Sequence, residues 1–125
     1  MNKLVKTIDK NDLILEYINA INGPLKLTER EKSLICVFIK ADIEYDKNPV
    51  GHKNVANKDV RKWITANLGV TKDNLSRYIK SFRERGMLKV GPAEDELRVN
   101  RILVPDLVGD RVQLTIILKL KQDDN

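Results

Sequence analysis

The feature that most constrains the fold is a change of hydrophobic period in the middle of the chain. Residues 58–68 and residues 72–85 each repeat apolar side chains at the spacing of a helix, and only a short turn around Gly69 separates them. After Gly86 the spacing falls to the alternation of a β-strand. This order predicts two short helices joined by a tight turn and followed by a β-hairpin.

The hairpin is predicted from its alternation and its turn residues. Residues 87–90 form the first strand, residues 97–100 return, and the turn-forming run Gly-Pro-Ala-Glu-Asp-Glu at residues 91–96 connects them. The loop before the two central helices leaves room for a further short strand at residues 50–55.

Two more helices are predicted upstream. Residues 11–22 place apolar side chains on one stripe, and Gly23 followed by Pro24 is expected to end this helix. The next helix begins at Thr28, because Thr28 and Glu31 have the spacing of a capping box. The broad apolar face of this second helix indicates a central, buried position.

The C-terminal region carries the clearest strand pattern. Apolar residues alternate with mostly polar ones over residues 112–120, which span roughly 30 Å in an extended conformation. An unpaired strand of this length invites a partner. We favour pairing with the hairpin, as a third strand inside the monomer. The alternative is a homodimer built through residues 11–22, through residues 112–120, or through both.

Composition excludes several classes of function. The 125 residues and 14.3 kDa fit a single domain, which we predict to span residues 1–125. A lone cysteine and a lone histidine, Cys36 and His52, exclude a disulfide framework and a Cys/His zinc site. No pair of titratable groups has catalytic spacing, and no glycine-rich phosphate loop is present. We therefore expect no enzyme activity, no metal and no cofactor.

The sequence also favours a cytoplasmic protein. Charged residues interrupt the apolar run that a signal peptide would need near the start. The longest apolar runs fall far short of the roughly 20 residues that span a bilayer. A single thiol fits a reducing compartment. We expect a protein without membrane contact, associated with the nucleoid if the source is bacterial or a phage.

The positive charge is concentrated in one block. Residues 51–90 hold 10 Lys and Arg against 3 Asp and Glu, a balance of +7, while the whole chain carries only +5. A concentrated positive field attracts polyanions and speeds their encounter. A solvated, lysine-rich surface explains the same numbers, so charge alone does not decide for nucleic acid.

The central stretch resembles a known class of DNA-binding protein. Residues 58–90 are similar to the helix-turn-helix and first wing strand of the winged-helix superfamily, with the rhythm of MarR-like regulators. The features that match, in chain order, are Gly69 in the turn, Thr71 at the start of the next helix, Leu75 and Ile79 on its inner face, and the run from Arg83 to Leu88.

The resemblance implies an α+β, mostly α, winged helix-turn-helix fold. Its core covers residues 28–104, with residues 1–27 as an N-terminal helical extension and residues 105–125 as a C-terminal strand and tail. It implies binding to double-stranded DNA through a major-groove recognition helix at about residues 72–85, in a transcription regulator. Small phage-encoded proteins share the pattern. The alternative is a winged-helix module for protein contact in a polymerase, replication or virion assembly.

The chemistry of the recognition helix suggests which side chains contact DNA. Arg77 can offer its planar fork to guanine, and Asn74 can pair with adenine. Lys80 suits phosphate as a point charge, and the free amides at Thr71 suit phosphate as well. The full predicted DNA-binding set is Lys58, Arg61, Lys62, Thr71, Lys72, Asn74, Ser76, Arg77, Lys80, Ser81, Lys89 and Arg98.

Some features weigh against DNA contact. Asp73 and Glu84 share the outer face of the recognition helix, and a charged face is what any solvated helix shows. The predicted wing tip carries three consecutive acidic residues, 94–96, which repel phosphate. We therefore expect the helix, and not the wing, to enter a groove. The low aromatic content disfavours a stacking platform for single strands.

Overall fold

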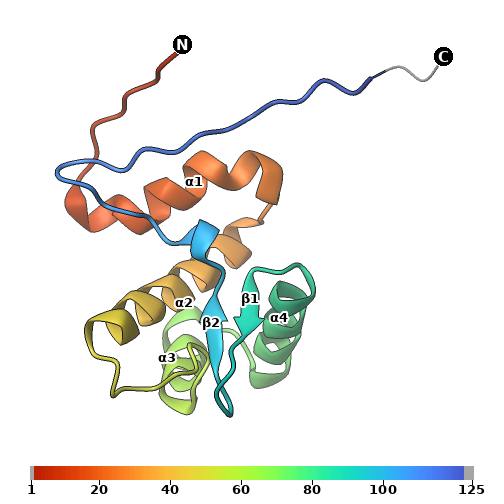
Figure 1. Cartoon of the computed structure of the whole chain (residues 1–125). Coiled ribbons are helices and arrows are strands. Elements are labelled where there is room, and N and C mark those ends of the chain that lie inside the picture. Colours follow the sequence, from red (N-terminus) through yellow and green to blue (C-terminus); the bar gives the residue numbers. More distant parts are fainter. Residues whose placement is uncertain (1, 123–125) are drawn as a thin grey trace.

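The chain folds as four α-helices and a two-stranded antiparallel sheet, described for residues 2–122 in a computed structural model (Figure 1). The helices are α1 at Leu13–Leu25, α2 at Glu29–Lys47, α3 at Lys58–Leu68 and α4 at Lys72–Glu84. The strands are β1 at Leu88–Val90 and β2 at Leu97–Val99, and two short 3-10 turns are η1 at Lys10–Asp12 and η2 at Arg101–Leu103. The α+β, mostly helical class is thus confirmed, with helices and hairpin in the predicted order.

The helix starts are fixed by local capping. The Thr28 hydroxyl accepts a hydrogen bond from the amide of Glu31 (3.2 Å), while the Glu31 carboxylate accepts one from the amide of Thr28 (2.9 Å). This confirms the capping box. Asn57 accepts from first-turn amides of α3, and the Thr71 hydroxyl does the same for α4. α2, α3 and α4 therefore each start where a short polar side chain satisfies open amides, whereas Asp12 at the start of α1 makes no such bond.

The end of α1 differs from the prediction. The helix continues through Gly23 and Pro24, so these residues do not terminate it. Asn22 instead fixes the exit, because its side chain donates to the carbonyl of Leu27 (3.1 Å) and accepts from the amide of Leu27 (2.8 Å). Lys26 then takes a left-handed φ of 55°. Pro24 is tolerated in the last turn, where its missing amide removes only one helical hydrogen bond.

The turn between α3 and α4 depends on Gly69, whose φ of 64° is left-handed. We expect Gly69→Ala to lower the free energy of unfolding by about 1–2 kcal/mol, because an L-residue is strained there although the space is open. Gly69→Asn is the matched control, because asparagine tolerates the left-handed region better than other residues with a Cβ atom. This variant should therefore lose less stability than Gly69→Ala at the same position. Urea unfolding measures both variants, and equal losses would contradict this reasoning.

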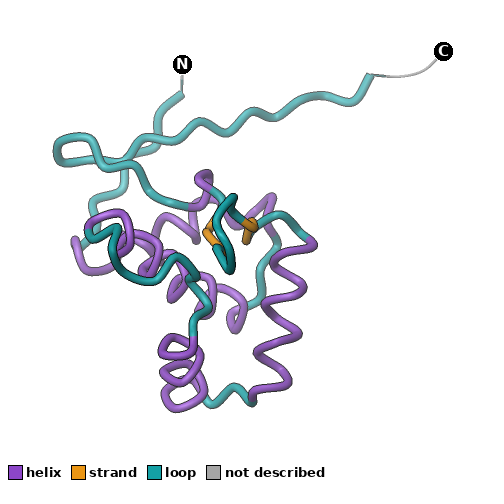
Figure 2. The backbone as a smooth tube through the Cα atoms, turned by 60° about the horizontal axis from the view of Figure 1, so that its bottom comes forward, coloured by secondary structure: helices purple, strands orange, loops and turns teal. Residues whose placement is uncertain are grey.

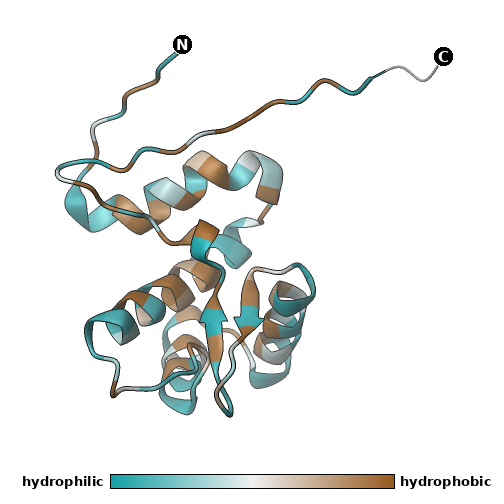
Figure 3. Cartoon of the chain, viewed as in Figure 1, coloured by the Kyte–Doolittle hydropathy of each residue, from teal (hydrophilic) through white to brown (hydrophobic). Residues whose placement is uncertain are grey.

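One hydrophobic cluster within the described residues joins the helices and the sheet. Ile18 of α1, Phe38 of α2, Ile64 of α3 and Phe82 of α4 are all fully buried. The rings of Phe38 and Phe82 meet edge to face with centroids 6.3 Å apart. Figure 3 shows the apolar residues concentrated where the elements face one another. Trp63 of α3 lies half-exposed, because it sits at the edge of the apolar stripe centred on Ile64.

The hairpin is confirmed, whereas the additional short strand is not. Leu88 lies opposite Val99 in the β1–β2 pair, and both side chains are buried, as is that of Leu97. The strand predicted at residues 50–55 is reduced to a single bridge, in which the amide of Val55 donates to the carbonyl of Leu97 (2.9 Å). The hairpin is thereby held to the loop before α3.

The C-terminal strand does not form inside the monomer. Residues 112–120, called the C-terminal arm below, run extended past α1 and away from the helical body (Figure 1). The hairpin lies on the other side of α1, and the bridge to Asn54 already occupies the outer side of β2. The prediction of a third strand is therefore wrong: over the described residues the sheet consists of β1 and β2, and the arm pairs with neither of them. The last three residues of the predicted tail at 105–125 lie outside the described residues.

A buried carboxylate fastens the hairpin to α2. Asp42 is fully buried and accepts hydrogen bonds from Nε and Nη2 of Arg98 (3.0 and 2.7 Å), from the amide of Val99 (2.8 Å) and from Arg101. Half-exposed Asp46, one helical turn further on, accepts from the same two arginines. Burial by itself raises the pKa of Asp42, but the hydrogen bonds from Arg98 and Val99 outweigh it, and the pKa lies below the ordinary value.

Candidate nucleic-acid interface

α4 turns an apolar face to the core and a cationic face to solvent. Leu75, Ile79 and Phe82 are buried, whereas Arg77 and Lys80 are exposed. Figure 2 shows this helix at the edge of the molecule, joined to α3 by a short loop. The outer side of α4 is therefore accessible along its length.

Hydrogen bonding of the arginines distinguishes α4 from the rest of the protein. The guanidinium groups that donate to an acceptor within the protein are those of Arg30, Arg61, Arg85, Arg98, Arg101 and Arg111. Over residues 2–122, Arg77 and Arg83 have no such acceptor, and both belong to α4. A guanidinium without a protein acceptor keeps its fork of donors for phosphate or guanine.

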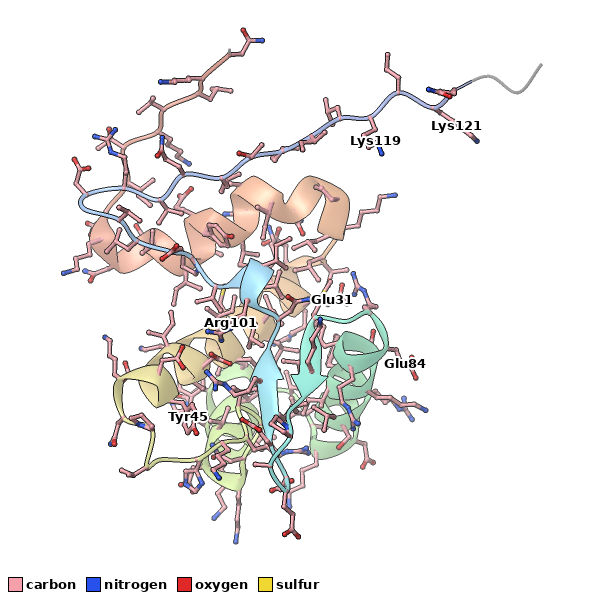
Figure 4. All side chains as sticks on the ribbon, viewed as in Figure 1. Glu31, Tyr45, Glu84, Arg101, Lys119 and Lys121 are labelled. Atoms are coloured by element: carbon pink, nitrogen blue, oxygen red, sulfur yellow. The ribbon has the colours of Figure 1, made fainter. Side chains whose placement is uncertain are left out.

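A shallow groove between α4 and β1 extends this cationic surface. Lys80, Arg83 and Glu84 line it from α4, and Lys89 and Val90 line it from β1. The cations outnumber Glu84, which projects outward from α4 in Figure 4, so the groove favours an anion. The sequence prediction omitted Arg83, because this residue lies at the edge of the polar face and approaches Lys89 only after the hairpin folds back beside α4.

The predicted residues on α3 divide into two groups. Lys58 and Lys62 are exposed and form no ion pair with any described residue. Arg61 is partly buried, and its Nε donates to the carbonyl of Ala56 (2.7 Å). Arg61 therefore supports the loop before α3, while Lys58 and Lys62 remain available to a ligand.

The predicted residues around α4 are mostly exposed. Thr71, Lys72, Asn74 and Ser76 lie at the surface, and Ser81 is half-buried. The Thr71 hydroxyl already caps the helix, whereas the side-chain amide of Asn74 donates to no acceptor in the described part of the chain. Asn74 is thus the more available of these two side chains.

The side chain of Arg98 is engaged within the protein and does not belong to the candidate interface. Besides its bonds to Asp42 and Asp46, its guanidinium lies over the ring of Tyr45, 4.5 Å from the centroid. The hydrogen bonds that Arg98 donates to Asp42, more than any other cause, raise the pKa of Arg98. Arg101 shares the same carboxylates and extends from η2 toward α2 (Figure 4). Both arginines lock the hairpin to α2, so we correct the predicted set by removing Arg98.

The hairpin tip is acidic and its side chains are engaged in the turn. The carboxylate of Glu96 accepts from the amide of Ala93 (3.0 Å), and that of Asp95 accepts from the side-chain amide of Asn54 (3.3 Å). Glu94 is exposed. These charges repel phosphate, so the geometry gives the tip no role in gripping a DNA backbone.

The other reactive side chains do not gather into a site. Burial raises the pKa of the Cys36 thiol to about 11, which keeps it protonated and unreactive at neutral pH. His52 is exposed, and Asp59 lies 3.9 Å from it. The described residues contain no group of three or more His, Cys, Asp or Glu side chains placed to hold a metal ion. Within that same part of the chain, no helix has the length and apolar character to cross a bilayer.

Comparison of the chain with protein-family models, with curated proteins and with solved structures gave no match.

Proposed function

We propose that the protein is a winged-helix protein that binds double-stranded DNA, with α4 as its recognition helix and transcription regulation as its role. The observation that carries the proposal is the outer face of α4. There Arg77 and Lys80 are exposed, and neither forms an ion pair with a described residue. The order of α3, the turn at Gly69, α4 and the hairpin supports the winged-helix assignment. Such a protein acts in the compartment that holds the DNA.

Base recognition would come from the exposed face of α4. An α-helix fits the major groove of B-DNA, and side chains on its outer face reach the base edges. Arg77 would offer two parallel donors to O6 and N7 of guanine. Asn74, nearly one turn earlier, would pair with N6 and N7 of adenine. Each such bidentate pair discriminates against the wrong base by about 1–3 kcal/mol.

Phosphate contacts would come from the cations around that face. Lys58 and Lys62 are exposed on α3, the helix that the turn at Gly69 joins to α4, and Lys72 lies in the first turn of α4, where the helix dipole also favours an anion. Arg83 and Lys89 in the groove between α4 and β1 would hold the backbone on the other side. These contacts position the protein, and the base contacts select the sequence.

Binding to another protein is the alternative to DNA binding, and the charge of the hairpin tip favours it. The hairpin tip carries three consecutive carboxylates, 94–96, and residues 1–50 contain 8 Lys and Arg against 8 Asp and Glu. A winged-helix module docked through such a tip would bind a basic protein surface in a polymerase, replication or virion assembly.

Salt dependence separates the two functions. We expect a labelled random duplex to bind with a log–log slope near −4.5 against salt concentration, because about five phosphates would be neutralised. Fluorescence anisotropy from low to physiological salt measures this slope, and a selection from a random duplex pool would then give the preferred site. Absence of duplex binding even at low salt would contradict the DNA proposal and favour protein contact.

A further inference from the structure

The C-terminal arm exposes a continuous apolar stripe. The side chains of Leu114 and Ile116 are 39 % and 51 % exposed, and those of Leu118 and Leu120 are 89 % and 93 % exposed. Val112, at the start of the stripe, is partly buried. Figures 1 and 2 both draw the arm outside the helical body. Contiguous exposed apolar surface of this kind marks an interaction site.

The backbone of the arm is also unpaired. Over residues 112–122 no amide or carbonyl makes a backbone hydrogen bond within the described chain, although the segment is extended. An extended segment with open donors and acceptors is a template for another strand. Of the two outer edges of the sheet, that of β2 is taken by the bridge to Asn54 and that of β1 faces the groove beside α4, so neither lies next to the arm. The partner strand must therefore come from another chain.

We propose that the arm pairs antiparallel with the arm of a second copy, about a two-fold axis through Ile116. In this register Val112 lies opposite Leu120 of the other copy, and Leu114 lies opposite Leu118. Ile116 meets its own equivalent on the axis. All the apolar side chains of the stripe then share one face of the ribbon. A shift by one residue would place the stripe of one copy opposite the polar face of the other.

The sequence is suited to its own copy in two further ways. No charged residue lies between Val112 and Leu118, so two proteins that each carry a net charge of +5 can approach there. On the other face of the ribbon, Gln113 would lie opposite Lys119, a neutral–charged pair. At each end of the ribbon Arg111 would lie opposite Lys121, where the ion pair of Arg111 with Asp110 (2.9 Å) offsets part of the repulsion. A partner of unrelated sequence would not require this symmetry, whereas an isologous dimer does.

The two-stranded ribbon that the two arms would form must pack against another element, because two strands alone are only marginally stable in water. α1 lies nearest to the arm in Figure 1, and its Leu15 is 47 % exposed. The apolar face of the ribbon would pack against α1 of each copy. Residues 11–22, the other surface that the sequence predicts for a dimer, would then take part in the interface. The arm leaves the body on the α1 side, so this arrangement keeps both α4 faces open. The dimer does not depend on the DNA proposal.

Mass measurement with a matched pair of variants tests the proposal. We expect light scattering at micromolar concentration to give about twice 14.3 kDa for the unchanged chain. Ile116→Lys should raise the dissociation constant of the dimer by at least about 100-fold, because each copy would bury a charge against its equivalent. Thr115→Lys adds the same charge on the polar face and should remain dimeric. Unchanged far-ultraviolet circular dichroism would show that the body is folded in both.

A monomeric mass for the unchanged chain across this range would overturn the proposal, as would a dimer that Ile116→Lys does not weaken. Cross-linking then tests the register in a Cys36→Ser background. Ile116→Cys should form a disulfide between copies, since directly opposed Cα atoms lie about 4.5–5.5 Å apart. Leu120→Cys should not, because antiparallel pairing separates the two equivalents by about 27 Å. Equal cross-linking at both positions would rule out the antiparallel pair.

Discussion

Replacing Arg77 and Lys80 together by glutamate is expected to raise the dissociation constant for duplex DNA by at least about 100-fold at physiological salt. The change removes one base contact and one phosphate contact in the proposed complex and adds repulsion from the DNA backbone. It should also reduce the steepness of the salt dependence by about one phosphate's share, or roughly 0.9 in slope. The fold should be unaffected, because both side chains are exposed and make no hydrogen bond with a described residue.

The control for this experiment carries the same change of charge elsewhere. Lys40 and Lys47 are exposed on α2 and do not line the groove between α4 and β1, so Lys40→Glu with Lys47→Glu should leave most of the affinity intact. Anisotropy measures affinity for all proteins, and circular dichroism confirms their folding. If the Arg77 and Lys80 double variant binds duplex as well as the unchanged protein does, α4 is not the recognition helix. Equal losses in both double variants would indicate an effect of net charge alone.

Features set by neighbouring residues were predictable from the sequence. The starts of α2 and α4 follow from Thr28 and Thr71, whose side chains satisfy amides three residues away. The change from helix to hairpin at Gly86 is a change of period over a few residues, and it required no knowledge of the tertiary structure. The outward direction of Arg77 and Lys80 follows in the same way, because helical period places Leu75 and Ile79 on the opposite side.

Features set by residues far apart in the chain were not predictable. The burial of Asp42 depends on Arg98, 56 residues away, and on the amide of Val99. As an arginine on a wing strand, Arg98 has the features that suggested a DNA contact. Only its contact with Asp42 shows that its side chain is unavailable to DNA. For Arg83 the opposite holds: the sequence did not suggest a DNA contact, but the folded hairpin brings Lys89 near it, and both residues line the same groove.

The C-terminal arm shows how a correct pattern can give a wrong pairing. Alternation over residues 112–120 describes a segment that can form a strand with one apolar face. It contains no information on where the partner strand lies. The connection through η2 carries the chain to the α1 side, where the described part of the protein contains no β-strand. The same pattern then becomes an argument for association between chains.

The Asp42 anchor gives the largest effect on stability that we expect from one substitution. Asp42→Asn keeps the side-chain volume but removes the charge that faces the guanidinium groups of Arg98 and Arg101. Breaking a buried pair on one side costs up to about 3–5 kcal/mol, and we expect the lower end of this range because both arginines keep Asp46 as a partner. Asp46→Asn is the matched control. Asp46 accepts from the same two arginines but is half-exposed, so its loss should cost less than about 1 kcal/mol.

The pH dependence of the stability lost in Asp42→Asn tests whether this loss is electrostatic. The pKa of Asp42 is lower in the folded protein than in the unfolded chain, where a free aspartate titrates near about 3.9. The contribution of the carboxylate is therefore complete above about pH 4 and is lost as the pH falls through the folded pKa. In urea unfolding, the gap between the unchanged protein and Asp42→Asn should be constant around neutral pH and should narrow in acid. A gap no larger than that of Asp46→Asn, or one that persists unchanged in strong acid, would mean that the charge of Asp42 does not hold the hairpin to α2.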